Sequence, residues 1–323
     1  MRTLIPVENS DTLTAVQGFL RRILEADIVD SLLVPMQTPH GAVAPTLVSD
    51  PKLLENANPI APVMGVNAAH LVGQVSVREP RERVGVVLRS CELRALIELV
   101  KLKQASLDDL VTIGVDCLGT YDVAVYAAIE GGDSEGPNSN AGLDLEAYLA
   151  TARDGEIVAQ EGQAFRDACQ MCEKPHAEGA DITLELFGAD LGEAIPVSLP
   201  DEMGETLGLG AVEDDDRRAE IVQKVVASRT KVRDERFAEM RDQLAREGVE
   251  GVFATCIRCH NCMTVCPICY CKTCLFKSQV FDHEPIQYAN WAHRKGAYRL
   301  PADTTLFHLT RLNHMVLSCI GCG

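Results

Sequence analysis

The chain has 323 residues, of which 46% are hydrophobic, and this suits one large globular domain with a smaller second domain. Its formal net charge of −17 argues against a nucleic-acid partner, because phosphate binding needs a basic surface. The first residues carry no apolar export signal and no run of about eighteen apolar residues could span a membrane, so we expect a cytoplasmic protein.

Helical and strand periods alternate along the first part of the chain. The spacing of apolar residues predicts, in chain order, a helix over 12–28, strands over 31–36, 43–48 and 84–88, a helix over 92–103 and a strand over 110–116. The last three elements form a β-α-β unit, and the run over 84–88 is continuously apolar, as in a strand buried on both faces. We therefore predict an α/β domain with a mostly parallel sheet, with an α+β arrangement as the alternative.

Turn-forming and charged segments divide the rest of the chain. In chain order we expect a turn-rich loop over 131–142, a helix over 144–152, strands over 181–187 and 194–199, and a long charged helix over 214–247. The long helix would join two domains. The predicted organisation is therefore a domain over 1–213, a linking helix over 214–250 and an α-helical, cysteine-rich domain over 251–323 that continues beyond residue 323.

Seven of the thirteen cysteines lie within one stretch of nineteen residues. In a cytoplasmic chain such thiols indicate metal ligation or redox chemistry rather than disulfides. The first four follow the pattern Cys256-x2-Cys259-x2-Cys262-x3-Cys266-Pro267, the spacing that wraps a 4Fe-4S cluster and passes its fourth cysteine to the other cluster of a two-cluster ferredoxin. A zinc site is the alternative, but zinc uses separated Cys-x2-Cys pairs around one ion.

The last residues hold the start of a second such motif, Cys319-x2-Cys322, after a spacer of 52 residues. A helical period over 304–317 leads into this motif. The long spacer and the helix resemble the helical ferredoxin type found in iron-sulfur subunits of succinate dehydrogenase and heterodisulfide reductase.

The helical ferredoxin resemblance implies two clusters, each completed by a ligand beyond residue 323. Its ligands in this chain would be Cys256, Cys259 and Cys262 for one cluster, and Cys266, Cys319 and Cys322 for the other. Three cysteines then have no assigned role: Cys269, Cys271 and Cys274. They either supply ligands that the clusters lack, hold an extra site, or are buried spare thiols.

Four further cysteines are dispersed through the first domain. Cys91 follows the buried strand over 84–88, and Cys117 follows the strand over 110–116. In a parallel sheet both positions lie at the same carboxyl edge, where ligands bind. With the pair Cys169-x2-Cys172 they make four thiols, so we predict that the four hold one 4Fe-4S cluster; taken singly, Cys91 and Cys117 would instead be core residues.

In chain order, these motifs resemble one protein family over residues 1–200. Arg-x-Cys-Glu-x-Arg-Ala-Leu (89–96), Ile-Gly-x-x-Cys-x-Gly (113–119), Cys-x2-Cys (169–172) and Ala-Asp-Ile-Thr-Leu (180–184) resemble the beta subunits of coenzyme F-420 hydrogenases and dehydrogenases, including formate dehydrogenases. The resemblance implies bound FAD and 4Fe-4S clusters, two or three in all. Simpler members carry the ferredoxin motif before this domain, whereas here the cluster motifs follow it.

We therefore expect an iron-sulfur, FAD-containing electron-transfer subunit that links F-420 or NAD(P) to a partner such as formate dehydrogenase, hydrogenase or a heterodisulfide-reductase-like subunit. Arg89 and Ser90 are candidate contacts for a flavin phosphate, or else solvent-facing turn residues. No catalytic residue is assigned, because no pattern of a hydrolytic site is present. The alternatives are a flavin-free iron-sulfur relay and docking subunit, and a zinc-binding assembly protein.

Overall fold

The computed structural model of the chain describes residues 1–39, 41–77, 82–131, 142–213, 216–257, 259–269, 271, 273–281, 283–297 and 303–323. These residues form two compact units, one of Met1–Glu235 with Ile320–Gly323 and one of Arg236–Cys319. Most of the turn-rich loop predicted over 131–142 lies outside the described residues. In the described parts of the chain, no helix combines the length and apolar character of a membrane span.

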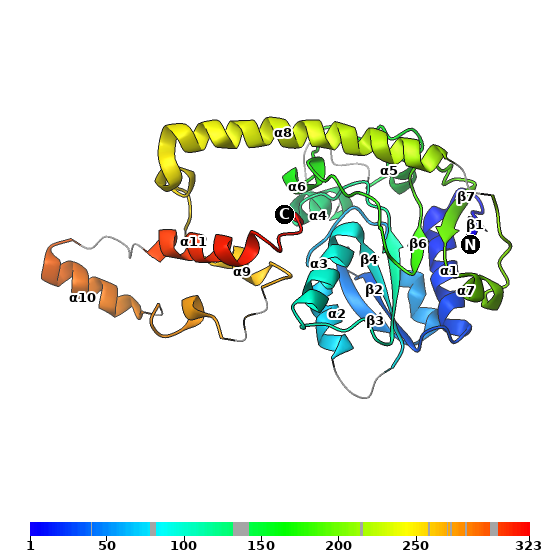
Figure 1. Cartoon of the computed structure of the whole chain (residues 1–323), viewed down its shortest axis with the longest axis horizontal. Coiled ribbons are helices and arrows are strands. Elements are labelled where there is room, and N and C mark those ends of the chain that lie inside the picture. The colour runs from blue at the N-terminus through cyan, green and yellow to red at the C-terminus, as the bar shows by residue number, and fades with distance from the viewer. Residues whose placement is uncertain are drawn as a thin grey trace. The chain divides into compact units, whose positions relative to one another are not determined.

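A seven-stranded sheet forms the centre of the described first unit, in the order β1-β7-β6-β5-β4-β2-β3 (Figure 1). Its strands are β1 (Arg2–Pro6), β2 (Ser31–Gln37), β3 (Val43–Val48), β4 (Val84–Arg89), β5 (Leu110–Val115), β6 (Ile182–Leu184) and β7 (Ala194–Ser198). The pairs β2–β4, β4–β5 and β5–β6 are parallel, and the remaining pairs are antiparallel. All strands except β3 and β7 therefore run in one direction, which confirms the predicted α/β fold.

Helices cover both faces of this sheet. Alternate residues of a strand point to opposite faces, so Val87 of β4 packs in the core that contains α1 (Thr12–Glu25), whereas its neighbours pack with α2 (Ala69–Ser76) and α3 (Ser90–Lys101). Figure 1 shows α2 and α3 together on one side of the sheet. Because apolar residues fill both cores, the strands read as continuous apolar runs in the sequence.

Shorter helices fill the connections of the first unit: η1 (Pro51–Asn56), α4 (Val123–Gly131), α5 (Leu145–Ala150), α6 (Asp167–Gln170) and α7 (Asp201–Thr206). The strand predicted over 181–187 is shorter than expected. After β6 the backbone N–H of Leu186 donates to the Asp116 carboxylate instead of to a neighbouring strand. A hydrogen bond to a side chain thus replaces the next bond between strands, and β6 ends there.

Helix α8 (Arg217–Val252) corresponds to the predicted linking helix. Val222 and Val225 near its start pack in the core of the first unit, and its helical backbone is interrupted at Gly248, where φ is 67°. The boundary between the two compact units falls inside α8, after Glu235. The domain limits given above stay predictions.

The second unit is helical in its described residues. Its elements after α8 are α9 (Asn261–Thr264), η2 (Leu275–Lys277), α10 (Pro285–Lys295) and α11 (Asp303–Met315). A small apolar core contains Met263, Phe276 and Phe307. Helix α11 matches the helix expected over 304–317.

The first helix shows how local sequence sets an element boundary, and this leads to a prediction. Asp11 is the N-cap of α1, and its carboxylate accepts hydrogen bonds from the backbone N–H of Thr14 at 2.9 Å and from the Thr14 hydroxyl at 2.7 Å. These bonds lower the pKa of Asp11 from its usual value of 3.8. We expect Asp11→Ala to reduce the free energy of unfolding by about 1 kcal/mol at pH 7, measured by urea titration.

The pH dependence of this cap follows from its lowered pKa. The ionised cap contributes stability above about pH 3.8, and the contribution is lost as pH falls through the lower pKa of the folded state. The difference between the natural chain and Asp11→Ala should therefore shrink in acid. Asp11→Asn is the control, because it keeps an acceptor for the Thr14 N–H; an equal loss in both variants would contradict the capping role.

Candidate functional site

Cys91 and Cys117 lie at one edge of the sheet. Cys91 is the second residue of α3, directly after β4, and Cys117 follows β5 by two residues. Because β4 and β5 are parallel neighbours in register, the two cysteines meet at the carboxyl ends of these strands. The chain therefore presents two thiols at the edge where open α/β sheets bind ligands.

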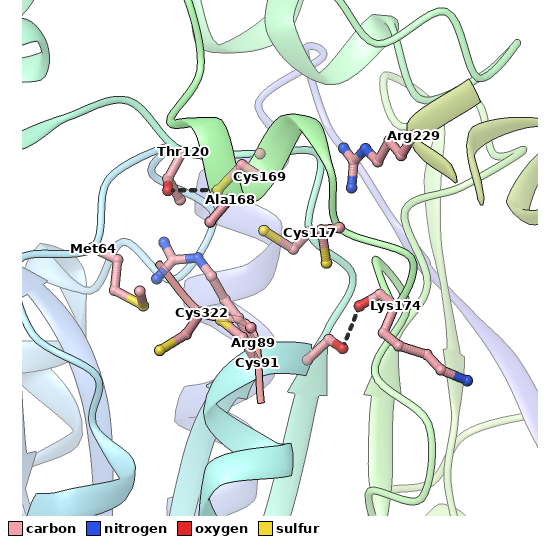
Figure 2. A pocket seen from close by; sticks show the side chains of 14 residues that line it. Met64, Arg89, Cys91, Cys117, Thr120, Ala168, Cys169, Lys174, Arg229 and Cys322 are labelled. Carbon is pink, nitrogen blue, oxygen red and sulfur yellow. Dashed lines mark hydrogen bonds between the residues drawn. The ribbon is translucent and has the colours of Figure 1, made fainter. Parts of the chain in front are cut away.

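A cavity at this edge brings together the dispersed cysteines of the first unit (Figure 2). Its lining includes Cys91, Cys117, Cys169 and Cys172, the four thiols that were predicted to act together. A fifth thiol, that of Cys322, lines the same cavity. The remaining lining residues are Met64, Arg89, Ser90, Gly119, Thr120, Ala168, Lys174, Arg229 and Gly321.

Hydrogen bonds hold the segment with Cys169 and Cys172 against the segment that follows β5. The backbone N–H of Cys117 donates to the carbonyl of Pro175 at 2.8 Å, and that of Arg166 donates to the carbonyl of Thr120 at 2.9 Å. The Thr120 hydroxyl lies 3.2 Å from the Cys169 sulfur, as the dashed line in Figure 2 shows. These backbone bonds lie on either side of Cys169 and Cys172 in the sequence, so they hold the pair beside Cys117.

The last residues of the chain are bound to the same region by two arginines. Arg94 donates to the carbonyl of Ile320 at 3.0 Å, and Arg166 donates to the carbonyls of Cys322 at 3.1 Å and Gly323 at 2.9 Å. These bonds explain how Cys322 reaches the cavity.

Buried positive charge surrounds the thiols. The guanidinium of Arg89 donates to the carbonyl of Ala61, and that of Arg229, on α8, donates to the carbonyl of Leu118. Both arginines are less than a tenth exposed. Their charge lowers the pKa of Cys117, although burial of this thiol outweighs the effect.

Burial dominates the acidity of two of these thiols. It raises the pKa of Cys117 to about 11, against the opposing effect of Arg89, and raises that of Cys91 well above its usual range. Cys91 and Cys117 are therefore not activated as nucleophiles, and a metal would have to displace their protons in order to bind.

The donor set fits an iron-sulfur cluster better than a single metal ion. Within the described residues, no three Cys, His, Asp or Glu side chains have the geometry that holds one ion. A zinc ion draws its sulfurs to about 2.3 Å from one centre, whereas the irons of a cluster keep the four thiolates farther apart. Four thiols from three chain segments, beside buried arginines, match a 4Fe-4S cluster in number and type.

Arg89 and Ser90 were predicted as flavin contacts or as solvent-facing turn residues. Both are buried, so the solvent-facing alternative is wrong. The Ser90 hydroxyl donates to the carbonyl of Lys174, and Arg89 is engaged by Ala61 and lies 3.9 Å from the Glu92 carboxylate. The Ser90 hydroxyl and one N–H group of Arg89 thus have protein partners, and both residues form part of the wall of the thiol cavity. Their role as flavin contacts stays a prediction.

The ferredoxin-type cysteines lie in the second unit, apart from Cys322. Cys256 lies 3.2 Å from the His308 ring nitrogen, and the Cys262 carbonyl accepts from Arg311 at 3.0 Å. Cys259 and Cys319 are exposed, and Cys266 is half-buried. The grouping of these cysteines into two clusters stays a prediction.

Three polar residues of the thiol cavity were not predicted from the sequence: Thr120, Lys174 and Arg229. Lys174 and Thr120 lie within a few residues of the cysteines, so their proximity was a usable signal. Arg229 is one of many charged residues on a long helix, and nothing in the sequence distinguishes it from the others.

A glycine beside the site leads to a further prediction. A methyl group on Gly114, in β5, would lie 2.6 Å from the Cβ of Ala177 and 2.9 Å from that of Ala180, in the segment that follows Cys172. We expect Gly114→Ala to lower the free energy of unfolding by about 1–3 kcal/mol through overpacking, measured by urea titration. Gly210→Ala, where no atom lies within 4 Å, is the control and should change stability by less than about 0.5 kcal/mol. Equal effects would contradict the close approach.

The chain is similar to known proteins of one kind. Residues 81–205 match the family model for the C terminus of the coenzyme F420 hydrogenase/dehydrogenase beta subunit. Over 338 aligned residues the chain is 24% identical to the F420-dependent formate dehydrogenase subunit beta of Methanocaldococcus jannaschii, covering 96% of this chain and 83% of the relative. It is likewise 24% identical to the F420-dependent formate dehydrogenase 1 subunit beta of Methanococcus maripaludis, covering 94% and 80%.

A solved structure shares the fold. A chain of the F420-reducing nickel-iron hydrogenase complex from Methanosarcina barkeri superposes with a TM-score of 0.51 at 13% identity, covering 73% of this chain and 91% of that chain. The family model and the two relatives confirm the resemblance to F-420 hydrogenase and dehydrogenase beta subunits. The helical ferredoxin part of the resemblance stays a prediction.

Proposed function

We propose that the chain is an iron-sulfur electron-transfer subunit of a multi-subunit, F-420- or NAD(P)-linked oxidoreductase. The observation that carries the proposal is the cavity at the ends of β4 and β5. Its four predicted ligands, Cys91, Cys117, Cys169 and Cys172, all lie within the residues that match the beta-subunit family. A cytoplasmic location suits such a protein, because cluster ligands must stay reduced.

The residues around the cavity would set the properties of a bound cluster, which supplies one-electron transfer. Arg89 and Arg229 favour added negative charge, so they would make reduction easier. The Thr120 hydroxyl, 3.2 Å from the Cys169 sulfur, would act in the same direction by a hydrogen bond to a ligand.

The relatives suggest what lies on either side of this relay. They are named as beta subunits of F420-dependent formate dehydrogenases, so the proposed electron donor or acceptor is F-420, with NAD(P) as the alternative carrier. The proposed partners are a catalytic subunit of the formate dehydrogenase, hydrogenase or heterodisulfide-reductase-like kind and further iron-sulfur subunits. Chemistry on formate or hydrogen would belong to that partner, and the predicted ferredoxin-type clusters would connect to it.

A flavin-free relay is the second candidate. FAD is implied by the family resemblance, but the Ser90 hydroxyl and one N–H group of Arg89 are already bonded within the protein. Fewer groups on these two residues are then left for a flavin phosphate, which suits a subunit that passes electrons through clusters alone. The two candidates differ in whether the chain itself exchanges hydride with F-420.

Anaerobic purification separates the candidates. Iron, acid-labile sulfide and acid-released flavin are measured per chain, and the protein is mixed with reduced F-420 or NADH while its visible absorbance is followed. Iron and sulfide with flavin, and bleaching by one carrier, support the flavin-containing subunit. Iron and sulfide without flavin select the relay. Zinc without sulfide overturns both and leaves the zinc-binding assembly protein.

A further inference from the structure

A second cavity, of about 340 Å³, lies within the second unit. Three of its wall residues are the cysteines without an assigned role, Cys269, Cys271 and Cys274, and His314 of α11 also lines it. The ferredoxin-type cysteines are absent from this wall among the described residues. Its other lining residues are Met263, Thr273, Leu275, Phe276, Phe307, Thr310, Arg311 and Met315.

The fold gathers these groups around an apolar base. Met263, Phe276 and Phe307 form the small core of the second unit, and Cys269 and Cys274 pack against it. The Cys274 sulfur lies 3.3 Å from the Met263 sulfur. The motif Cys269-x-Cys271-x2-Cys274 thus ends on the core, while α11 brings an imidazole from forty residues away in sequence.

The chemistry of the wall favours a soft metal centre. Thiolate and imidazole are ligands for zinc, copper and iron, whereas the thioethers of Met263 and Met315 are neutral and weak ligands for iron. The three thiols and His314 supply four ligands, the number that a 4Fe-4S cluster takes. Arg311, on the same wall, offers positive charge against the thiolates.

The arrangement of the donors favours a cluster over a single ion. A tetrahedral ion draws its ligands to one centre. Here the four donors share the wall of a cavity of about 340 Å³ with eight other residues, and within the described residues no three of them are grouped around a single-ion position. A multinuclear group, whose ligands lie farther apart, suits this wall better.

We propose that Cys269, Cys271, Cys274 and His314 bind a 4Fe-4S cluster, separate from the clusters assigned to the other cysteines. An imidazole in place of one thiolate raises the reduction potential of an iron-sulfur centre. This cluster therefore has a higher potential than an all-cysteine cluster in the same place. The site does not depend on Cys91, Cys117, Cys169 or Cys172, so its test is independent of the proposed function.

The first test removes the three thiols from the full chain, prepared without oxygen. The triple variant Cys269→Ser, Cys271→Ser, Cys274→Ser should lose about four iron and four sulfide per chain relative to the natural protein. Thr273→Ala, on the same wall, is the control and should keep both. Unchanged iron and sulfide would overturn the site, and loss of zinc without sulfide would overturn the cluster.

The second test does not depend on how well the triple variant folds. In the dithionite-reduced natural protein, pulsed electron paramagnetic resonance should detect a nitrogen coupled to a cluster. His314→Cys should keep the iron, lose this nitrogen coupling and lower the potential of one cluster. Absence of coupled nitrogen in the natural protein, or a coupling that survives His314→Cys, would exclude the imidazole ligand and overturn the proposed ligand set.

Discussion

Cys117→Ser should remove one whole 4Fe-4S cluster, so that iron and acid-labile sulfide each fall by about four per chain. The reason is that a serine hydroxyl is a hard, weakly acidic ligand that replaces a soft thiolate poorly on iron. The backbone of Cys117 is held by its hydrogen bond to Pro175. Because Cys322 also lines the cavity, Cys117→Ser is made both alone and together with Cys322→Ser. Metal analysis and the spectrum of the reduced protein measure the effect.

Met64→Leu is the matched control for the cysteine variant. Met64 lines the same cavity and carries a sulfur, but a thioether does not replace a thiolate as an iron ligand. The control should keep its iron and its sulfide. If Cys117→Ser kept both as well, even together with Cys322→Ser, the cavity would not be a cluster site and the proposed function would lose its main support.

The sequence predicted the site best where an apolar strand pattern is followed directly by a cysteine. The apolar runs over 84–88 and 110–116 predicted two buried strands, and parallel pairing then places Cys91 and Cys117 at one edge. Strand β1 was not predicted, because it pairs with β7 almost two hundred residues later and its five residues show only weak alternation. Such long-range pairing leaves little local trace.

The charged residues of the site were harder to predict from the sequence than its cysteines. Cysteine spacing is specific, because few structures need several thiols in close succession. Arg229 reaches the cavity only because α8 packs through Val222 and Val225 against the core of the first unit. A helix that is charged over most of its length gives no sign of which arginine will be buried, so tertiary packing alone determines this part of the site.

The second large effect is expected at Asp116, the residue before Cys117. Its side chain is fully buried, and its two oxygens each lie 2.9 Å from the Arg218 guanidinium. The carboxylate also accepts from the backbone N–H groups of Leu186 at 3.0 Å and Ala177 at 3.2 Å. Asp116→Asn puts an amide donor where two or more donors already converge, so it should lower the free energy of unfolding by about 3 kcal/mol, measured by urea titration.

The arginine next to Arg218 in α8, Arg217, forms an exposed ion pair that provides the control. Arg217 and Asp154 form an ion pair at 3.1 Å with both side chains exposed, so Asp154→Asn should cost less than about 1 kcal/mol. Arg218→Met and the double variant complete a double-mutant cycle; a coupling energy near zero would show that the buried pair is not a unit.

Since Asp116 holds the end of β5, Asp116→Asn should also speed the loss of iron to a chelator. If Asp116→Asn were destabilised but lost iron at the natural rate, Asp116 would stabilise the fold without stabilising the cluster site.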